Sequence, residues 1–254
     1  PRKTISCSQS RTEIIDRGQA PRSIPTPADP LKLIEDEIQG LRYSGAAADT
    51  RFSGGAVGYI SYEYANRVEP AVQLADEDQL GLPLLFFMIA DLVLIFDHAC
   101  QTLTICANAY VEERPEDAYR DACERIDETI KLLNVPSLLK PESLAKSPEI
   151  SVPEGNVSKR EFEEMVERTK EYVRAGDVIQ TVLSQRFSVP FSHPPLNLYR
   201  AIRAINPSPY MFLMEGDGFS IVGASPEVHV RLTEDDVLIR PIAGTRPRGK
   251  NEAE

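Results

Sequence analysis

Tryptophan is absent from this chain, and histidine and cysteine are scarce: the 254 residues include no Trp, three His and four Cys. The cysteines form no Cys-x-x-Cys pair and none stands at zinc-finger spacing from a histidine, which argues against a structural zinc site. A chain of this length can bury a sizeable core without disulfides. We therefore take a reducing compartment as the default and expect the protein to be cytoplasmic.

Long apolar runs and an excess of positive charge are also missing. The most apolar stretch, Leu82 to Ile95, is interrupted by Asp91 and falls short of the ~18 residues that span a membrane. Lys and Arg total 28 against 39 Asp and Glu, so the formal charge is −11. This balance argues against nonspecific nucleic-acid binding, which needs clustered cations. It allows an anionic small substrate, because local fields outweigh the net charge.

Composition divides the chain into two folded parts and a connector. Residues 1–134 form the expected N-terminal subdomain, the proline-rich residues 135–157 the connector, and residues 158–254 the first part of a second subdomain. Apolar periodicity predicts helices over 29–41, 116–134, 158–175 and 196–205. Ser158 and Glu161 have the spacing of a capping box, Gly176 is a plausible helix stop, and Pro195 opens the last helix. The periodicity also predicts strands over 88–96, 102–110, 177–189, 210–215, 219–224, 228–232 and 237–242. The first two, joined by the polar residues 97–101, are expected to form a hairpin. Short connections favour antiparallel pairing, so the expected class is α+β, with large antiparallel β-sheets flanked by helices.

A segment near the C-terminus has the composition of an anion site. A predicted strand ends there in Gly244 and Thr245, and Arg246 and Arg248 follow. Gly244 lets a ligand approach bare backbone, and such donors can hold a carboxylate or a phosphate. The alternative is a solvated basic loop, since short motifs have low specificity.

Three other segments each admit a functional and an ordinary interpretation. Glu227, at a corner between two apolar strands, can serve as a general acid, or it can simply bond a backbone amide where a strand starts. Pro209, Tyr210 and Met211 suit an apolar ligand pocket, or a loop that caps a core. Gln180 shares a strand face with polar neighbours, which matters only if that face lines a cleft. The sequence contains no Ser-His-Asp order, no GxxxxGK[ST] and no GxGxxG.

Taken together, these segments resemble the chorismate-utilising enzyme family, and among its branches component I of anthranilate synthase. Each motif is weak alone, but their shared order is specific and spans nearly the whole chain. The matching segments are Phe52 to Tyr62, Phe96 to His98 with Gln101 to Leu103, Asp177 to Gln180, Arg186-Phe187, Asn206 to Met211, Gly223 to Glu227, and Pro241 to Gly249.

The resemblance implies roles for the candidate residues. Gly244 and Thr245 match the pair that binds chorismate, and Glu227 lies where the hydroxyl leaves. Pro209, Tyr210 and Met211 match the site of feedback inhibition by tryptophan. The implied reaction joins ammonia, supplied by a glutamine amidotransferase partner (component II), to chorismate and yields anthranilate and pyruvate. The implied cofactor is Mg²⁺, which holds the ring carboxylate.

Two positions discriminate among the branches of the family. Isochorismate and salicylate synthases have a Lys base where Gln180 stands, and a neutral Gln cannot activate water in that way. Aminodeoxychorismate synthases commonly carry a nucleophilic Lys in place of Ala243. Both positions favour anthranilate synthase. Aminodeoxychorismate synthase and a non-catalytic tryptophan-binding relative remain as alternatives.

The ends of the chain suggest a piece of a longer protein. It starts at Pro1 and stops directly after a segment rich in Gly and Arg. The resemblance implies a Leu-Glu-Ser strand before Pro1, and a catalytic His and two Mg²⁺-binding Glu after Glu254. We therefore expect an incomplete fold, no metal ligands within the chain, and no catalysis by these 254 residues alone.

Overall fold

The structure, a computed structural model, describes residues 1–42, 52–75, 78–111, 114–136, 153, 155–242, 244 and 249–251. The chain divides into two compact units. The first comprises Pro1–Ser137 with Met214–Ile221, and the second Leu138–Leu213 with Val222–Glu254. Within the described residues, no helix is long and apolar enough to cross a membrane.

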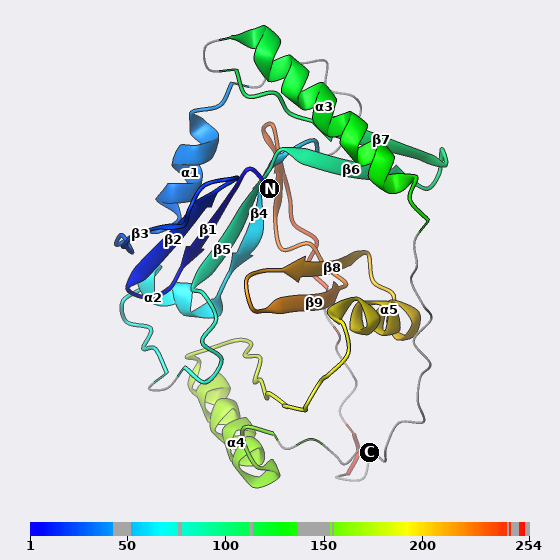
Figure 1. Ribbon diagram of the computed structural model, residues 1–254. Helices are drawn as coiled ribbons and strands as arrows, with labels where there is room; N and C mark the ends of the chain where they lie inside the picture. The colour runs from blue at the N-terminus through cyan, green and yellow to red at the C-terminus, as the bar shows by residue number, and fades with distance from the viewer. Residues whose placement is uncertain are drawn as a thin grey trace. The chain divides into compact units, whose positions relative to one another are not determined.

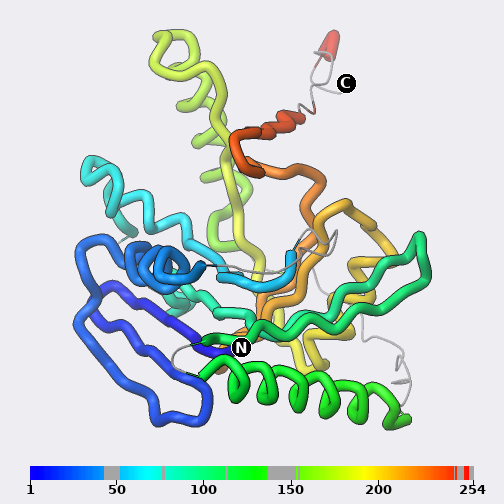
Figure 2. The backbone as a smooth tube through the Cα atoms, turned by 90° about the horizontal axis from the view of Figure 1, so that it is seen from above, coloured from blue at the N-terminus to red at the C-terminus, as the bar shows by residue number. Residues whose placement is uncertain are grey.

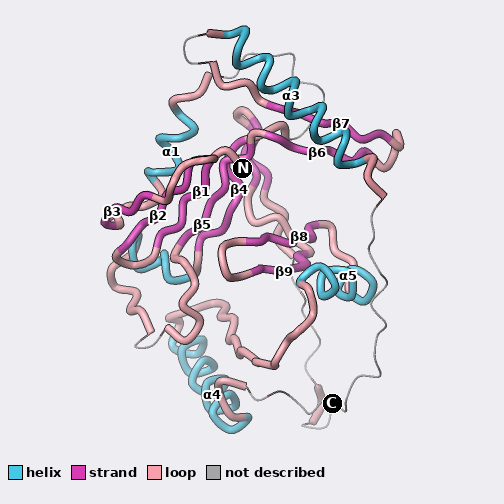
Figure 3. The backbone as a smooth tube through the Cα atoms, viewed as in Figure 1, coloured by secondary structure: helices cyan, strands magenta, loops and turns pink. Residues whose placement is uncertain are grey.

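An antiparallel five-stranded sheet forms the centre of the first unit (Figure 1, Figure 3). In spatial order its strands are β3 (Arg22–Pro25), β2 (Arg11–Asp16), β1 (Lys3–Cys7), β5 (Leu85–Ala90) and β4 (Gly55–Ile60). Helix α1 (Lys32–Gln39) packs its buried Ile34 against one face, as the helical pattern over 29–41 predicts. Alternate strand residues reach that face because successive side chains point to opposite sides. The resulting core cluster consists of Ile5, Cys7, Ile14, Ile34 and Leu85.

The predicted single strand over 88–96 is wrong, because the chain leaves the sheet at Asp91. Strand β5 ends at Ala90, and β6 (Leu92–Asp97) begins a separate sheet. Asp91 is only 2% exposed. Its carboxylate oxygens lie 2.5 Å from Arg17 Nη2 and 3.0 Å from Arg125 Nη1. A buried carboxylate needs such partners, and meeting both of them fixes the break between the two strands.

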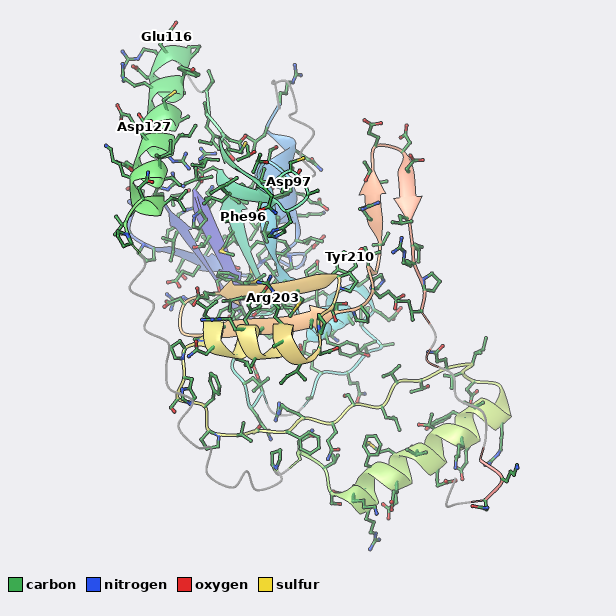
Figure 4. All side chains as sticks on the ribbon, turned by 90° about the vertical axis from the view of Figure 1, so that its right-hand side faces the viewer. Phe96, Asp97, Glu116, Asp127, Arg203 and Tyr210 are labelled. Carbon is green, nitrogen blue, oxygen red and sulfur yellow. The ribbon has the colours of Figure 1, made fainter. Side chains whose placement is uncertain are left out.

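Strand β6 pairs with β7 (Thr102–Ala107) as the predicted hairpin. The labelled Phe96 and Asp97 stand at its turn (Figure 4). The amides of Cys100 and Ala99 donate to Asp97 Oδ1, which holds the pKa of that carboxyl below its ordinary value. Helix α3 (Pro115–Leu133), predicted over 116–134, lies along this hairpin (Figure 2). The connection between β4 and β5 carries the short helices η1 (Tyr62–Tyr64) and α2 (Ala65–Val68).

The second unit contains two helices whose starts were predicted from local chemistry. Helix α4 (Lys159–Ala175) begins with the expected capping box of Ser158 and Glu161. It stops at Gly176, whose φ of +86° suits a residue without a side chain. Helix α5 (Pro195–Ile205) begins with proline, which needs no amide partner at that position.

The predicted strand over 177–189 is wrong, and the strands after residue 228 are shorter than predicted. Within the described residues, the only bridge in 177–189 joins Phe187 to Gly155. An apolar, β-branched sequence stays irregular where no neighbouring strand completes its hydrogen bonds. Strands β10 (Arg231–Thr233) and β11 (Asp236–Leu238) pair antiparallel and have only three residues each.

Candidate functional site

A two-stranded hairpin positions most of the candidate residues. It is built from β8 (Tyr210–Glu215) and β9 (Ser220–Ser225), close to the predicted ranges. Gly216 donates its amide to Phe219 O at 3.0 Å across the Asp217-Gly218 turn. Gly218 has a φ of +77°, which is a natural conformation for glycine. Tyr210 stands at the open end of the hairpin (Figure 4).

Gly223 is required by the side chain across from it. A Cβ added at this position would lie 2.2 Å from Cζ of the Phe212 ring. Real carbon contacts are never so short, so the ring occupies the space that any other residue would need. The glycine of the Gly-Ala-Ser-Pro-Glu segment therefore fixes how closely β8 and β9 pack.

Glu227 follows the open end of β9 and is held by contacts from two directions. Ser225 Oγ donates to Glu227 O at 3.0 Å and accepts from Glu227 N at 3.4 Å. The Glu227 carboxylate accepts a hydrogen bond from the amide of Ile242, with Oε1 3.2 Å from the nitrogen. This backbone contact is the ordinary interpretation of Glu227, and it also places the carboxylate beside the segment that leads to Gly244.

Gly244 is exposed, and a Cβ built on it would meet nothing within 4 Å. A ligand therefore has open access to the backbone at this point. Thr245, its predicted partner, lies outside the described residues, as does Ala243. The structure thus brings together Glu227 and Ile242, in the irregular segment after β11 that leads to Gly244, and it leaves Thr245 as a prediction.

Gln180 and the segment of Pro209, Tyr210 and Met211 differ in how they are held. Gln180 is exposed, in a stretch without regular structure, and no hydrogen bond joins it to Glu227 among the described residues. Pro209 is exposed, Tyr210 is 41% exposed, and Met211 is partly buried at the start of β8. The hairpin therefore joins the Pro-Tyr-Met segment to the segment of Glu227, whereas Gln180 belongs to a stretch without regular structure.

The described residues contain no group of three or more His, Cys, Asp or Glu side chains that could hold a metal ion. We therefore derive no chemical step through the metal from the residues of this chain.

One feature of the second unit was not predicted from the sequence. A cavity of about 680 Å³ lies along α4, with Phe162, Val166, Val173 and Leu183 among its lining residues and two cations, Lys170 and Arg174, at its wall. The apolar residues at helical spacing could have indicated an apolar face of α4, but not what lies opposite it. Ser225 was likewise missed as a support of Glu227. Its place two residues before Glu227, in a Ser-Pro-Glu turn, was the available signal.

The fold and the segments around Glu227 define the class of protein. The chain belongs to the chorismate binding enzyme family, which matches residues 3–254. The predicted α+β class with antiparallel sheets and helices is confirmed by a solved relative. This is anthranilate synthase component I from Streptococcus pneumoniae TIGR4, with a TM-score of 0.76 at 28% identity, covering 93% of this chain and 51% of that one.

Curated relatives point to the same branch of the family. The probable anthranilate synthase component 1 of Schizosaccharomyces pombe is 39% identical over 229 residues, which are 89% of this chain and 46% of the relative. Anthranilate synthase component 1 of Acetivibrio thermocellus is 36% identical over 260 residues, covering 100% of this chain and 52% of the relative. The chain therefore spans about half the length of the curated relatives it matches.

Proposed function

We propose that this chain forms part of an anthranilate synthase component I, which converts chorismate and ammonia into anthranilate and pyruvate for tryptophan biosynthesis in the cytoplasm. The observation that carries the proposal is the hydrogen bond from the Ile242 amide to the Glu227 carboxylate. It holds the carboxyl group of Glu227 next to the backbone that, by resemblance, binds the substrate. The named relatives support the same assignment.

In the proposed reaction, chorismate and ammonia are converted into anthranilate, pyruvate and water, one molecule of each. Ammonia forms a bond to the ring, and the C4 hydroxyl leaves with a proton. The enolpyruvyl group then departs as pyruvate, and loss of a ring proton makes the product aromatic. Glu227, in its protonated form, donates the proton to the departing hydroxyl as a general acid.

The other candidate residues bind or orient the substrate. The backbone at Gly244, with the amide and hydroxyl of Thr245, holds a carboxylate of chorismate. Gln180 presents a neutral amide, which does not activate water as a lysine base does, so amination rather than hydration follows. Mg²⁺ would supply charge neutralisation for the ring carboxylate when it is bound, and the described residues contain no group of three or more His, Cys, Asp or Glu side chains to hold it.

Two partners complete the proposal. A glutamine amidotransferase subunit, component II, supplies ammonia. L-Tryptophan inhibits by binding at Pro209, Tyr210 and Met211, where an exposed ring and a partly buried thioether offer an apolar surface next to rigid proline. Because the chain contains no Trp, the fluorescence of added tryptophan reports binding without background from this sequence.

The experiment supplies the complete polypeptide that carries this sequence with chorismate, ammonium and Mg²⁺, and identifies the product by fluorescence and mass. Anthranilate is expected, and 4-amino-4-deoxychorismate would instead assign the aminodeoxychorismate branch. Glu227→Gln should lower kcat by about 10²-fold or more, the usual contribution of a general acid. Glu215→Gln, on the same hairpin, serves as the matched control and should leave kcat unchanged. A Glu227→Gln variant within threefold of the parent kcat would refute the acid role.

A further inference from the structure

The hydroxyl of Ser225 holds the backbone of Glu227 at two atoms. Ser225 Oγ donates to Glu227 O at 3.0 Å and accepts from Glu227 N at 3.4 Å, so one side chain uses its donor and an acceptor site on the same residue. Pro226 stands between them. Proline fixes its own φ and keeps the preceding residue extended, which suits Ser225 as the last residue of β9. The turn after β9 therefore leaves Glu227 few ways to reorient.

The carboxylate of Glu227 is held at the base of the hairpin of β10 and β11. The register pairs Arg231 with Leu238 at the open end of that hairpin, and continuing it outward along both chains places Glu227 opposite Ile242. Both residues lie outside the strands, and Glu227 Oε1 accepts from the Ile242 amide at 3.2 Å. A side chain thus makes the kind of contact with this amide that a backbone carbonyl makes within a strand pair. It holds the acid beside the segment that leads to Gly244.

The two carboxyl oxygens of Glu227 differ because of this contact. An N–H donates to a lone pair, so in the protonated acid Oε1 is the carbonyl oxygen and Oε2 carries the proton. In the proposed reaction the bond between Oε2 and this proton breaks, and the proton passes to the C4 hydroxyl, which leaves as water when its bond to the ring breaks.

Transfer of the proton changes the strength of the Ile242 contact. The amide then donates to a charged carboxylate, and charge-assisted hydrogen bonds are roughly twice as strong as neutral ones. The contact therefore strengthens as the proton leaves. An interaction that is stronger in the transition state than in the substrate complex raises kcat and leaves substrate binding unchanged.

We propose that Ser225 is a positioning residue for this reaction, because it holds Glu227 so that Oε1 stays on the Ile242 amide and Oε2 delivers the proton. The inference rests on the proposed function, whose general acid it uses. It adds the residue that orients the acid and the oxygen that donates. Without the hydroxyl, Glu227 keeps its carboxyl group and loses its fixed direction.

The first test measures the kinetics of the complete polypeptide that carries this sequence, with chorismate, ammonium and Mg²⁺. Ser225→Ala should lower kcat roughly tenfold and leave KM for chorismate within twofold, because a misdirected catalytic group costs rate rather than binding. Ser225→Thr, which keeps the hydroxyl, should restore kcat to within threefold of the parent. Ser220→Ala, the same change at the other end of β9, is the matched control and should behave like the parent.

The same substitution in a Glu227→Gln background separates positioning from general support of the fold. A residue that acts through Glu227 loses its effect once the acid is gone, so Ser225→Ala should then change kcat by less than about twofold. A tenfold loss in both backgrounds would overturn the proposal, and so would a Ser225→Ala variant with the parent kcat.

The contribution of the Ile242 amide is tested by an ester bond at that position, which removes the N–H and keeps the side chain. The kcat should fall roughly tenfold, as expected from the loss of a hydrogen bond to a charged group, with KM within twofold. The same replacement at Ile239, which also lies outside the strands, should leave kcat unchanged. An unchanged kcat with the ester at Ile242 would refute the assigned role of the Oε1 contact.

A last measurement does not depend on activity. Hydrogen exchange at the Ile242 amide of the complete polypeptide reports on its bond to Glu227. Ser225→Ala should speed this exchange roughly fivefold, as expected from weakening one hydrogen bond, whereas Ser225→Thr and Ser220→Ala should not. Unchanged exchange in Ser225→Ala would overturn the proposal at any level of activity. A parent polypeptide that forms no anthranilate would instead refute the proposed function, and exchange alone would then decide whether Ser225 holds Glu227.

Discussion

The buried carboxylate of Asp91 gives the sharpest test of how the first unit is held together. The carboxylate forms ion pairs with Arg17, in the turn after β2, and with Arg125, on α3. One buried charge therefore links the main sheet, the start of β6 and a helix. Asp91→Asn keeps the shape of the side chain and removes the charge. The two guanidinium groups would then face each other without an anion between them.

The cost follows from how deeply each partner is buried. The side chain of Asp91 is 3% exposed, that of Arg125 15% and that of Arg17 45%. Removing one member of a buried pair typically costs 3–5 kcal/mol, because the remaining charge cannot reach water. Arg17 can regain hydration and Arg125 cannot, since its Nη2 is already buried without a hydrogen-bond partner among the described residues. We therefore expect Asp91→Asn to lower the free energy of unfolding by about 3 kcal/mol.

Asp117 provides a matched control on the surface of the same protein. It also stands between two arginines, with 2.7 Å to Arg114 Nε and 2.5 Å to Arg120 Nη2, but it is 36% exposed. Exposed pairs contribute roughly 0–1 kcal/mol, so Asp117→Asn should cost less than about 1 kcal/mol. Urea unfolding followed by circular dichroism, with hydrogen exchange over β5 and β6, measures both variants. Equal losses would refute the argument that burial, rather than the number of ion pairs, sets the cost.

Three further predictions follow from local geometry. Gly58→Ala should lower the free energy of unfolding, measured in urea, by about 1–3 kcal/mol, because the new Cβ would lie 2.0 Å from Phe86 O on the paired strand β5. That oxygen belongs to the backbone and cannot move aside, so an unchanged free energy of unfolding would contradict the contact. Burial, followed by the hydrogen bond to Asp29, raises the pKa of Tyr64 from 10 to about 12. The folded state favours the protonated phenol, so this stabilisation is fully present below pH 10 and lost as the pH rises from 10 to about 12. Tyr64→Phe should flatten the dependence of unfolding free energy on pH in that window, and an unchanged slope would count against it. Ser158→Ala should cost about 1 kcal/mol and fray the start of α4, seen by hydrogen exchange, whereas Thr at this position should retain the cap.

Local chemistry explains where sequence reasoning succeeded on the fold. The capping box at Ser158, the glycine stop at Gly176 and the proline start at Pro195 each act within one helical turn, so the sequence alone places them. The hairpin over β6 and β7 follows from alternation around a polar turn in the same way. The strand over 177–189 failed because a strand requires a neighbour, and alternation does not reveal whether one is present.

The same distinction between local chemistry and tertiary contacts applies to the candidate site. The residue types and their order in the sequence determined Glu227, Gly244 and the Pro-Tyr-Met segment as candidates, since the chemistry of an acid, a bare backbone and an apolar contact is carried by the residues themselves. Only the tertiary structure decided that Ile242 binds the Glu227 carboxylate, that the Phe212 ring fills the space at Gly223, and that Arg17 and Arg125 meet at Asp91. These contacts join residues distant in sequence, and their positions depend on how the strands and helices pack together, which no local pattern encodes.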